Sequence, residues 1–83
     1  MEIGEVARVD SGGNVVFLCR QTATDWTVSQ DRWETGARQL SAAIAVDDSG
    51  GEPNWRVVAM PGRRNRRDVR TWAAAIDIAL NIH

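Results

Sequence analysis

The chain has 83 residues, of which 43% are hydrophobic and 25% are charged, and its formal net charge at pH 7 is −1. This length predicts one domain over residues 1–83, and this composition excludes a disordered chain, which would hold fewer apolar residues and more net charge. The near-neutral charge also disfavours a dedicated nucleic-acid-binding domain, since such domains are usually basic.

Three short apolar segments near the start of the chain predict an antiparallel meander. Residues 3–9 and 14–20 flank the turn sequence Asp-Ser-Gly-Gly, and a third segment follows at residues 26–29. In residues 14–20 both alternating sets of side chains are apolar, which is typical of a strand in the middle of a sheet. This run includes Cys19, which we expect to be a small buried apolar side chain.

A first helix is predicted from Asp31 to about Val46. Asp31 is a favourable N-cap, and Glu34 stands three residues later, which is the spacing of a capping box. Apolar residues then recur at helical spacing, namely Trp33, Ala37, Leu40 and Ile44. We expect this single apolar stripe to pack on the sheet.

The second half of the chain predicts a fourth strand and a last helix. After the loop Asp-Asp-Ser-Gly-Gly-Glu-Pro-Asn, residues 55–60 form an apolar run that is typical of a strand. Asn65 is a candidate N-cap for a helix over residues 66–82.

The predicted last helix is apolar over more than half of its circumference. Its expected core stripe consists of Val69, Trp72, Ala73, Ile76, Ala79 and Leu80. Ala75, Ile78 and Ile82 extend the apolar surface to the far side. Such a helix is usually buried on two sides, so either it lies in the middle of the domain, or Ile78 and Ile82 form an interface with a partner or a second copy.

Together these elements predict an α+β fold with the order β-β-β-α-β-α. A three- to four-stranded, mainly antiparallel sheet would carry both helices on one face. The fourth strand is reached through a helix, which allows it to pair in parallel with a neighbour.

The sequence shows no combination of residues typical of an active site or a metal site. A single cysteine and a single histidine, His83, cannot complete a zinc site, and a serine nucleophile would need a well-placed histidine. The glycine spacings of phosphate-binding loops are also absent from the sequence. We therefore expect a protein that is not an enzyme and binds no metal, cofactor or small-molecule substrate.

The sequence also holds no pattern that would direct the chain to a membrane. No apolar run approaches the roughly 20 residues that a spanning helix needs, and the first residues do not resemble a secretory signal. We expect a cytoplasmic protein without membrane contact.

The most distinctive segment is Pro-Gly-Arg-Arg-Asn-Arg-Arg-Asp-Val-Arg-Thr-Trp, at residues 61–72. Five of its residues are arginines, namely Arg63, Arg64, Arg66, Arg67 and Arg70. At the start of a helix, guanidinium groups and free backbone N–H groups would form a site for carboxylate or phosphate. Trp55 and Trp72 are expected near these arginines. Tryptophan beside arginine suits a protein hot spot or a nucleobase.

These features favour a small non-enzymatic interaction or regulatory module. Its arginines would bind a protein partner with an acidic surface, or a second copy of the chain. Nucleic-acid binding through the same arginines is the alternative, and a solvated surface without a ligand is a third interpretation. Small chains of this kind are often carried by phages or mobile elements and inhibit a host complex, an expectation that comes from the class of protein and not from particular residues.

Overall fold

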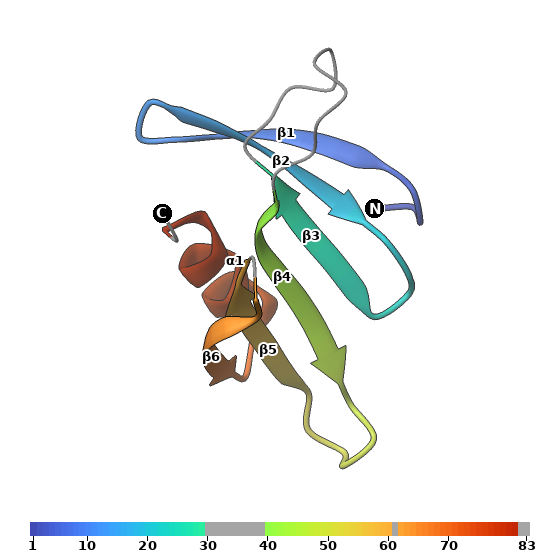
Figure 1. The fold of residues 1–83 in the computed structure, drawn as a ribbon. Coiled ribbons are helices and arrows are strands. Elements are labelled where there is room, and N and C mark those ends of the chain that lie inside the picture. The colour runs from blue at the N-terminus through green and yellow to red at the C-terminus, as the bar shows by residue number, and fades with distance from the viewer. Residues whose placement is uncertain (30–39, 61, 82–83) are drawn as a thin grey trace.

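The structure of the chain, a computed structural model, describes residues 1–29, 40–60 and 62–81. Within these residues the chain forms one six-stranded sheet, whose strands follow one another in chain order, and one helix (Figure 1). The elements are β1 (Val6–Ser11), β2 (Asn14–Arg20), β3 (Asp25–Ser29), β4 (Leu40–Asp47), β5 (Asn54–Ala59), β6 (Arg64–Val69) and α1 (Trp72–Leu80). All five neighbouring pairs of strands are antiparallel, so the parallel pairing that a helical crossover would allow does not occur in them.

The predicted fold is wrong in its numbers of strands and helices. Residues 40–47 form β4 instead of the second half of a helix, and residues 64–69 form β6 instead of the start of the last helix. In the described part of the chain, a six-stranded antiparallel sheet with one short C-terminal helix therefore replaces the three- to four-stranded sheet with two helices. The expected start of the first helix, with Asp31, Trp33, Glu34 and Ala37, lies outside the described residues.

β4 is a strand because its alternate residues fill the core. Ala42 and Ile44 are 0% and 1% exposed, and both lie between partners on β3 and β5. Leu40 and Ile44 stand four positions apart, a spacing that puts two side chains on one side of a helix, while Ala42 and Ile44 stand two apart, a spacing that puts them on one side of a strand. The sequence pattern alone therefore does not distinguish the two structures here.

β6 begins at a turn that needs left-handed backbone. Gly62, Arg63 and Asn65 have φ values of 88°, 52° and 56°. β6 also holds one residue more than β5 at this point, because Val57 pairs with Arg67 while Ala59 pairs with Arg64. Asparagine tolerates left-handed backbone better than most residues, which suits it to such a bulge. Asn65 is thus a bulge residue and not the N-cap of a helix.

The helix starts at Trp72, later than the sequence predicts. Thr71 is its N-cap, with extended backbone and a side-chain oxygen that accepts a hydrogen bond of 3.2 Å from the N–H of Ala74. Threonine is a favourable N-cap residue, because its hydroxyl satisfies a backbone N–H that has no partner within the helix.

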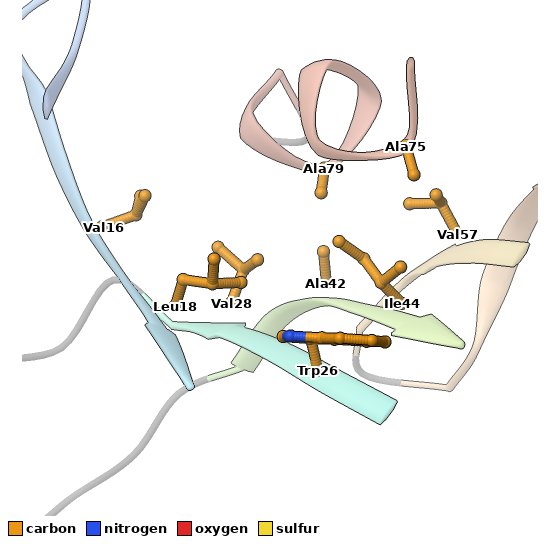
Figure 2. Packing of buried hydrophobic residues seen from close by; sticks show 9 residues of the cluster. All are labelled: Val16, Leu18, Trp26, Val28, Ala42, Ile44, Val57, Ala75 and Ala79. Atoms are coloured by element: carbon orange, nitrogen blue, oxygen red, sulfur yellow. The ribbon is translucent and has the colours of Figure 1, made fainter. Parts of the chain in front are cut away.

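The core lies between α1 and the face of the sheet that α1 covers, which we call the inner face. The opposite face is called the outer face. Figure 2 shows Ala75 and Ala79 pointing from α1 toward Ala42, Ile44 and Val57. The rest of the buried cluster consists of Val16, Leu18, Trp26 and Val28.

The buried side of α1 differs from the predicted one. Ala75, expected on the far side, is 0% exposed, whereas Ala73, expected in the core, is exposed. Ile78 is half-buried and packs against the core, and Ile82 lies outside the described residues. Cys19 is buried, as the apolar run around it predicts.

The loop between β4 and β5 starts with a local turn at Asp47. The Oδ1 atom of Asp47 accepts hydrogen bonds from the hydroxyl of Ser49 at 2.7 Å and from the N–H of Ser49 at 3.0 Å. The hydroxyl bond and then the N–H bond lower the pKa of Asp47 below its ordinary value, and the charge of Arg56 adds a smaller effect in the same direction. Hydrogen bonds to a carboxylate favour its charged form.

Replacing Ser49 with alanine should raise the pKa of Asp47 part of the way to its ordinary value, since the N–H donor remains. An NMR titration of the Asp47 carboxyl carbon in both proteins measures this change. Because the pKa is lowered by folding, the charged carboxylate contributes stability above the pKa of the unfolded chain. That contribution is lost as the pH falls through the pKa of the folded protein. An identical Asp47 pKa in both proteins would contradict the role of the hydroxyl.

Candidate functional site

The arginine-rich segment lies on an edge strand and not at the start of a helix. Within the described residues β6 pairs with β5 alone, and Arg64, Arg66 and Arg67 are exposed on it. The N-terminus of α1 comes later, at Thr71. The structure therefore provides an edge strand, in place of helix N–H groups, as the setting of these guanidinium groups.

The side chains of this segment divide between the two faces of the sheet. Arg64 and Arg67 pair with Ala59 and Val57, which belong to the inner face. Asp68 pairs with Arg56 on the outer face, and Arg66 lies there too, bonded to Asp68. Alternation along β6 and its bulge thus distribute the predicted cluster over both faces.

Arg64 and Arg67 line a groove of about 450 Å³ between β6 and α1, which we call the β6–α1 groove. Its other lining residues are Ala59, Asn65, Asp77, Ile78 and Asn81. The groove brings two of the predicted arginines together with Ile78, which the sequence indicated as a separate contact. Two guanidinium groups beside an apolar side chain can bind a carboxylate and an aliphatic group at the same time.

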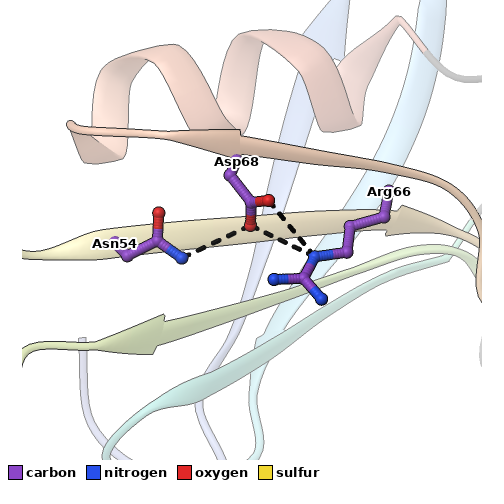
Figure 3. Close-up of polar contacts among 3 residues, drawn as sticks. All are labelled: Asn54, Arg66 and Asp68. Atoms are coloured by element: carbon purple, nitrogen blue, oxygen red, sulfur yellow. Dashed lines mark hydrogen bonds and ion pairs between the residues drawn. The ribbon is translucent and has the colours of Figure 1, made fainter.

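The arginines of the segment differ in their partners. Figure 3 shows the Nε atom of Arg66 bonded to both oxygens of Asp68, at 3.3 and 3.2 Å, while Asn54 donates to the same carboxylate at 3.3 Å. Arg70 pairs with Glu52 at 3.2 Å, and both side chains of this pair are largely exposed. Arg67 has no ion pair with any residue that the structure describes. Arg67 is therefore the arginine of the groove whose charge is available to a partner.

Trp55 and Trp72 lie away from this groove. Their rings pack on each other and on Trp26, with centroid separations of 5.1 to 5.5 Å. The register places Trp55 opposite Val69, at the other end of β6 from Arg64. All three rings contribute to the inner-face core, so stacking on a base or a partner is not the role that their packing suggests.

The outer face holds a second groove that the sequence pattern did not reveal. It has a volume of about 360 Å³, with Ala43 and Ala45 among its lining residues and with Asp25, Arg56 and Arg63 as its charged side chains. The Nε atom of Arg56 is buried and has no hydrogen-bond partner among the described residues. Alternation in residues 55–60 could have placed Arg56 on the face opposite Trp55 and Val57, but it could not show that Arg63 lies beside it.

Within residues 1–29, 40–60 and 62–81, no helix is long and apolar enough to cross a membrane. The same residues contain no group of three or more His, Cys, Asp or Glu side chains arranged to hold a metal ion. Comparison of the chain with models of protein families, with curated proteins and with solved structures finds no match. The candidate site is the β6–α1 groove, which brings Arg64, Arg67 and Ile78 together.

Proposed function

We propose that the protein is a small non-enzymatic cytoplasmic interaction or regulatory module that binds an acidic segment of a partner protein in the β6–α1 groove. The observation that carries this proposal is the presence of Arg64, Arg67 and Ile78 in one groove. Arginine binds carboxylates through two parallel hydrogen bonds, and the side chain of Ile78 offers apolar contact beside them.

The edge of β6 supports an extended partner. No other strand pairs with the far side of β6 within the described residues, so its outward N–H and C=O groups can accept an added strand. A strand added there would pass Arg64 and Arg67 on one face and Arg66 on the other. A peptide strand carries side chains toward both faces, so one added strand can contact both sets of arginines.

The charge distribution supports an acidic protein more than a nucleic acid. Residues 63–70 hold five arginines and one aspartate, while the remaining residues hold five arginines and ten acidic residues. The segment is thus a positive region on a negative protein. Such a distribution attracts an acidic partner to one place, while the rest of the surface repels a long polyanion.

The test uses a labelled peptide in which glutamate and leucine stand two positions apart, so that an added strand carries both toward the groove, with fluorescence anisotropy as the measurement. The affinity should fall at least about tenfold in the variant Arg64→Ser/Arg67→Ser, because the groove loses the available charge of Arg67 and the second guanidinium beside it. The matched control is Arg70→Ser, which removes an arginine of the same segment outside the groove and should leave the affinity nearly unchanged.

Two outcomes would contradict the proposal. One is the absence of peptide binding at about 50 mM salt, where charge attraction is least screened. The other is an equal loss of affinity in the Arg70→Ser control. Binding of single- or double-stranded DNA or RNA, with an affinity that falls steeply between about 50 and 200 mM salt, would instead favour the nucleic-acid alternative.

A further inference from the structure

The opposite edge of the sheet, formed by β1, carries a charge pattern that is complementary to itself. Within the described residues β1 pairs with β2 on one side and with no strand on the other. Arg8 and Asp10 lie on the outer face of β1, with side chains that are 65% and 71% exposed and 3.7 Å apart. Val9 lies between them on the inner face, where it packs against the core.

The turn before β2 determines which backbone groups of β1 point outward. Gly12 and Gly13 have φ values of 56° and 92°, as in a two-residue type I′ turn, in which the flanking residues Ser11 and Asn14 form a hydrogen-bonded pair. Hydrogen-bonded pairs alternate along an antiparallel ladder. The odd-numbered residues of β1 therefore bond to β2, and the N–H and C=O groups of Val6, Arg8 and Asp10 point away from the sheet.

A bond outside the strand agrees with this alternation. The N–H of Arg20 donates to the C=O of Glu5 at 3.1 Å, so that another odd-numbered residue directs its carbonyl toward the end of β2.

We propose that two copies of the chain pair antiparallel through their β1 strands, around a two-fold axis at Val9. This register puts Arg8 of each copy opposite Asp10 of the other. Both residues have outward backbone groups, so each of the two pairs exchanges both of its main-chain hydrogen bonds. Opposite charges that face each other across a ladder stabilise the pairing.

Other two-fold registers oppose like charges or leave charges unpaired. An axis at Arg8 sets that residue against its own copy, and an axis at Asp10 does the same for the carboxylate. An axis at Ala7 sets Arg8 against Val6 and leaves Asp10 without an opposite charge. An axis between two residues sets each even-numbered residue, whose backbone groups point outward, opposite an odd-numbered residue, whose backbone groups bond to β2. No ladder of hydrogen bonds between the two copies forms in that register.

The side chains of both faces suit the axis at Val9. On the outer face the two copies contribute four charges that alternate in sign. On the inner face Val9 meets Val9 of the second copy at a non-hydrogen-bonded position, where side chains approach most closely. A contact in which the same residues serve both copies is the usual form of a two-fold interface, which is why the partner is a second copy and not another protein.

Charge exchange tests the register directly, with sedimentation equilibrium as the measurement. The wild-type chain should dimerise, and Arg8→Asp or Asp10→Arg alone should weaken the dimer at least about tenfold, since two attractive pairs become repulsive. An equimolar mixture of the two variants should form a heterodimer, because the carboxylates of one then face the guanidinium groups of the other. The double variant Arg8→Asp/Asp10→Arg should dimerise like the wild type.

Arg64→Ser/Arg67→Ser, on the opposite edge, is the matched control and should leave the dimer intact. Circular dichroism verifies that each variant is folded, which both exposed positions allow. The proposal is overturned by a wild-type chain that stays monomeric at millimolar concentration, or by single variants that dimerise as well as the wild type. It is also overturned by a mixture that stays monomeric while the wild type dimerises, because the two copies would then meet in another register or through another surface.

Discussion

Replacing Trp26 with alanine should lower the free energy of unfolding by about 3–5 kcal/mol, which is the usual cost of removing a large buried aromatic side chain. Trp26 lies on β3 with 8% of its surface exposed. Its ring is 5.5 Å from the ring of Trp55 and 5.1 Å from that of Trp72, and the guanidinium of Arg20 lies 5.2 Å from its centroid. The variant loses all of these contacts and leaves a cavity beneath the start of α1.

The effect is large compared with the stability of a small domain. A chain of this length has about 4–12 kcal/mol of unfolding free energy, so Trp26→Ala should lose at least about a quarter of it. Urea unfolding followed by circular dichroism measures the loss. Trp26→Phe is the matched control, since it keeps an aromatic ring at the centre of the cluster and should lose clearly less stability. Equal urea midpoints for the wild type and Trp26→Ala would contradict the structural role of the cluster.

Part of the loss should come from Arg20, which the tryptophan ring helps to hold in place. The guanidinium of Arg20 donates hydrogen bonds to the carbonyl oxygens of Thr22 and Ala23, at 3.2 and 2.9 Å, and to that of Met1. It thereby links the turn after β2 to the N-terminal residues. The guanidinium of Arg20 lies over the Trp26 ring, so replacing Trp26 with alanine also removes a cation–π contact that stabilises this link.

Replacing Ala75 with leucine should destabilise the protein by about 1–3 kcal/mol, because extra methyl groups would separate α1 from the sheet. Ala75 is 0% exposed and points toward Val57 at the inner face (Figure 2). A small side chain at this position lets the helix approach the strands closely. The urea midpoint of the variant measures the loss.

The matched control is Ala73→Leu, which makes the same substitution two positions earlier in α1. Ala73 is exposed, and leucine is nearly as good a helix former as alanine, so its unfolding free energy should change little. A similar loss in both variants would show that the helix, and not its contact with the sheet, is sensitive to the substitution. That result would contradict the packing of Ala75 on β5.

The two proposed contacts use opposite edges of one sheet and are compatible with each other. β1 and β6 are the first and last strands in the order of the sheet (Figure 1). Pairing of two copies through β1 would leave a β6–α1 groove near each end of the joined sheet. A partner with two acidic segments could then be bound at both grooves, which raises the overall affinity above that of either groove.

Much of the sheet can be predicted from local sequence. Residues 14–20, 26–29 and 55–60 are expected as strands and form β2, β3 and β5 to within a residue. The antiparallel meander of the first three strands is confirmed as well. Alternating apolar residues and turn residues carry this information, because both act over a few neighbouring positions.

The candidate site was predicted in its residues but not in its geometry. The density of arginines identified Arg64 and Arg67, and the apolar far side of the last helix identified Ile78. That these residues line one groove depends on the bulge at Asn65 and on the start of α1 at Thr71. Both depend on how β6 meets β5, which no local pattern expresses.

The sequence by itself therefore determined a small α+β chain, the positions of its central strands and the place of its arginines. The tertiary structure decided the states of residues 40–47 and 64–69. The first segment has spacings that fit a helix or a strand, and it becomes a strand because β3 and β5 surround it. Residues 64–69 have five polar residues before Val69. They become a strand because β5 offers unpaired backbone N–H and C=O groups, and hydrogen bonds to these groups require no apolar side chain.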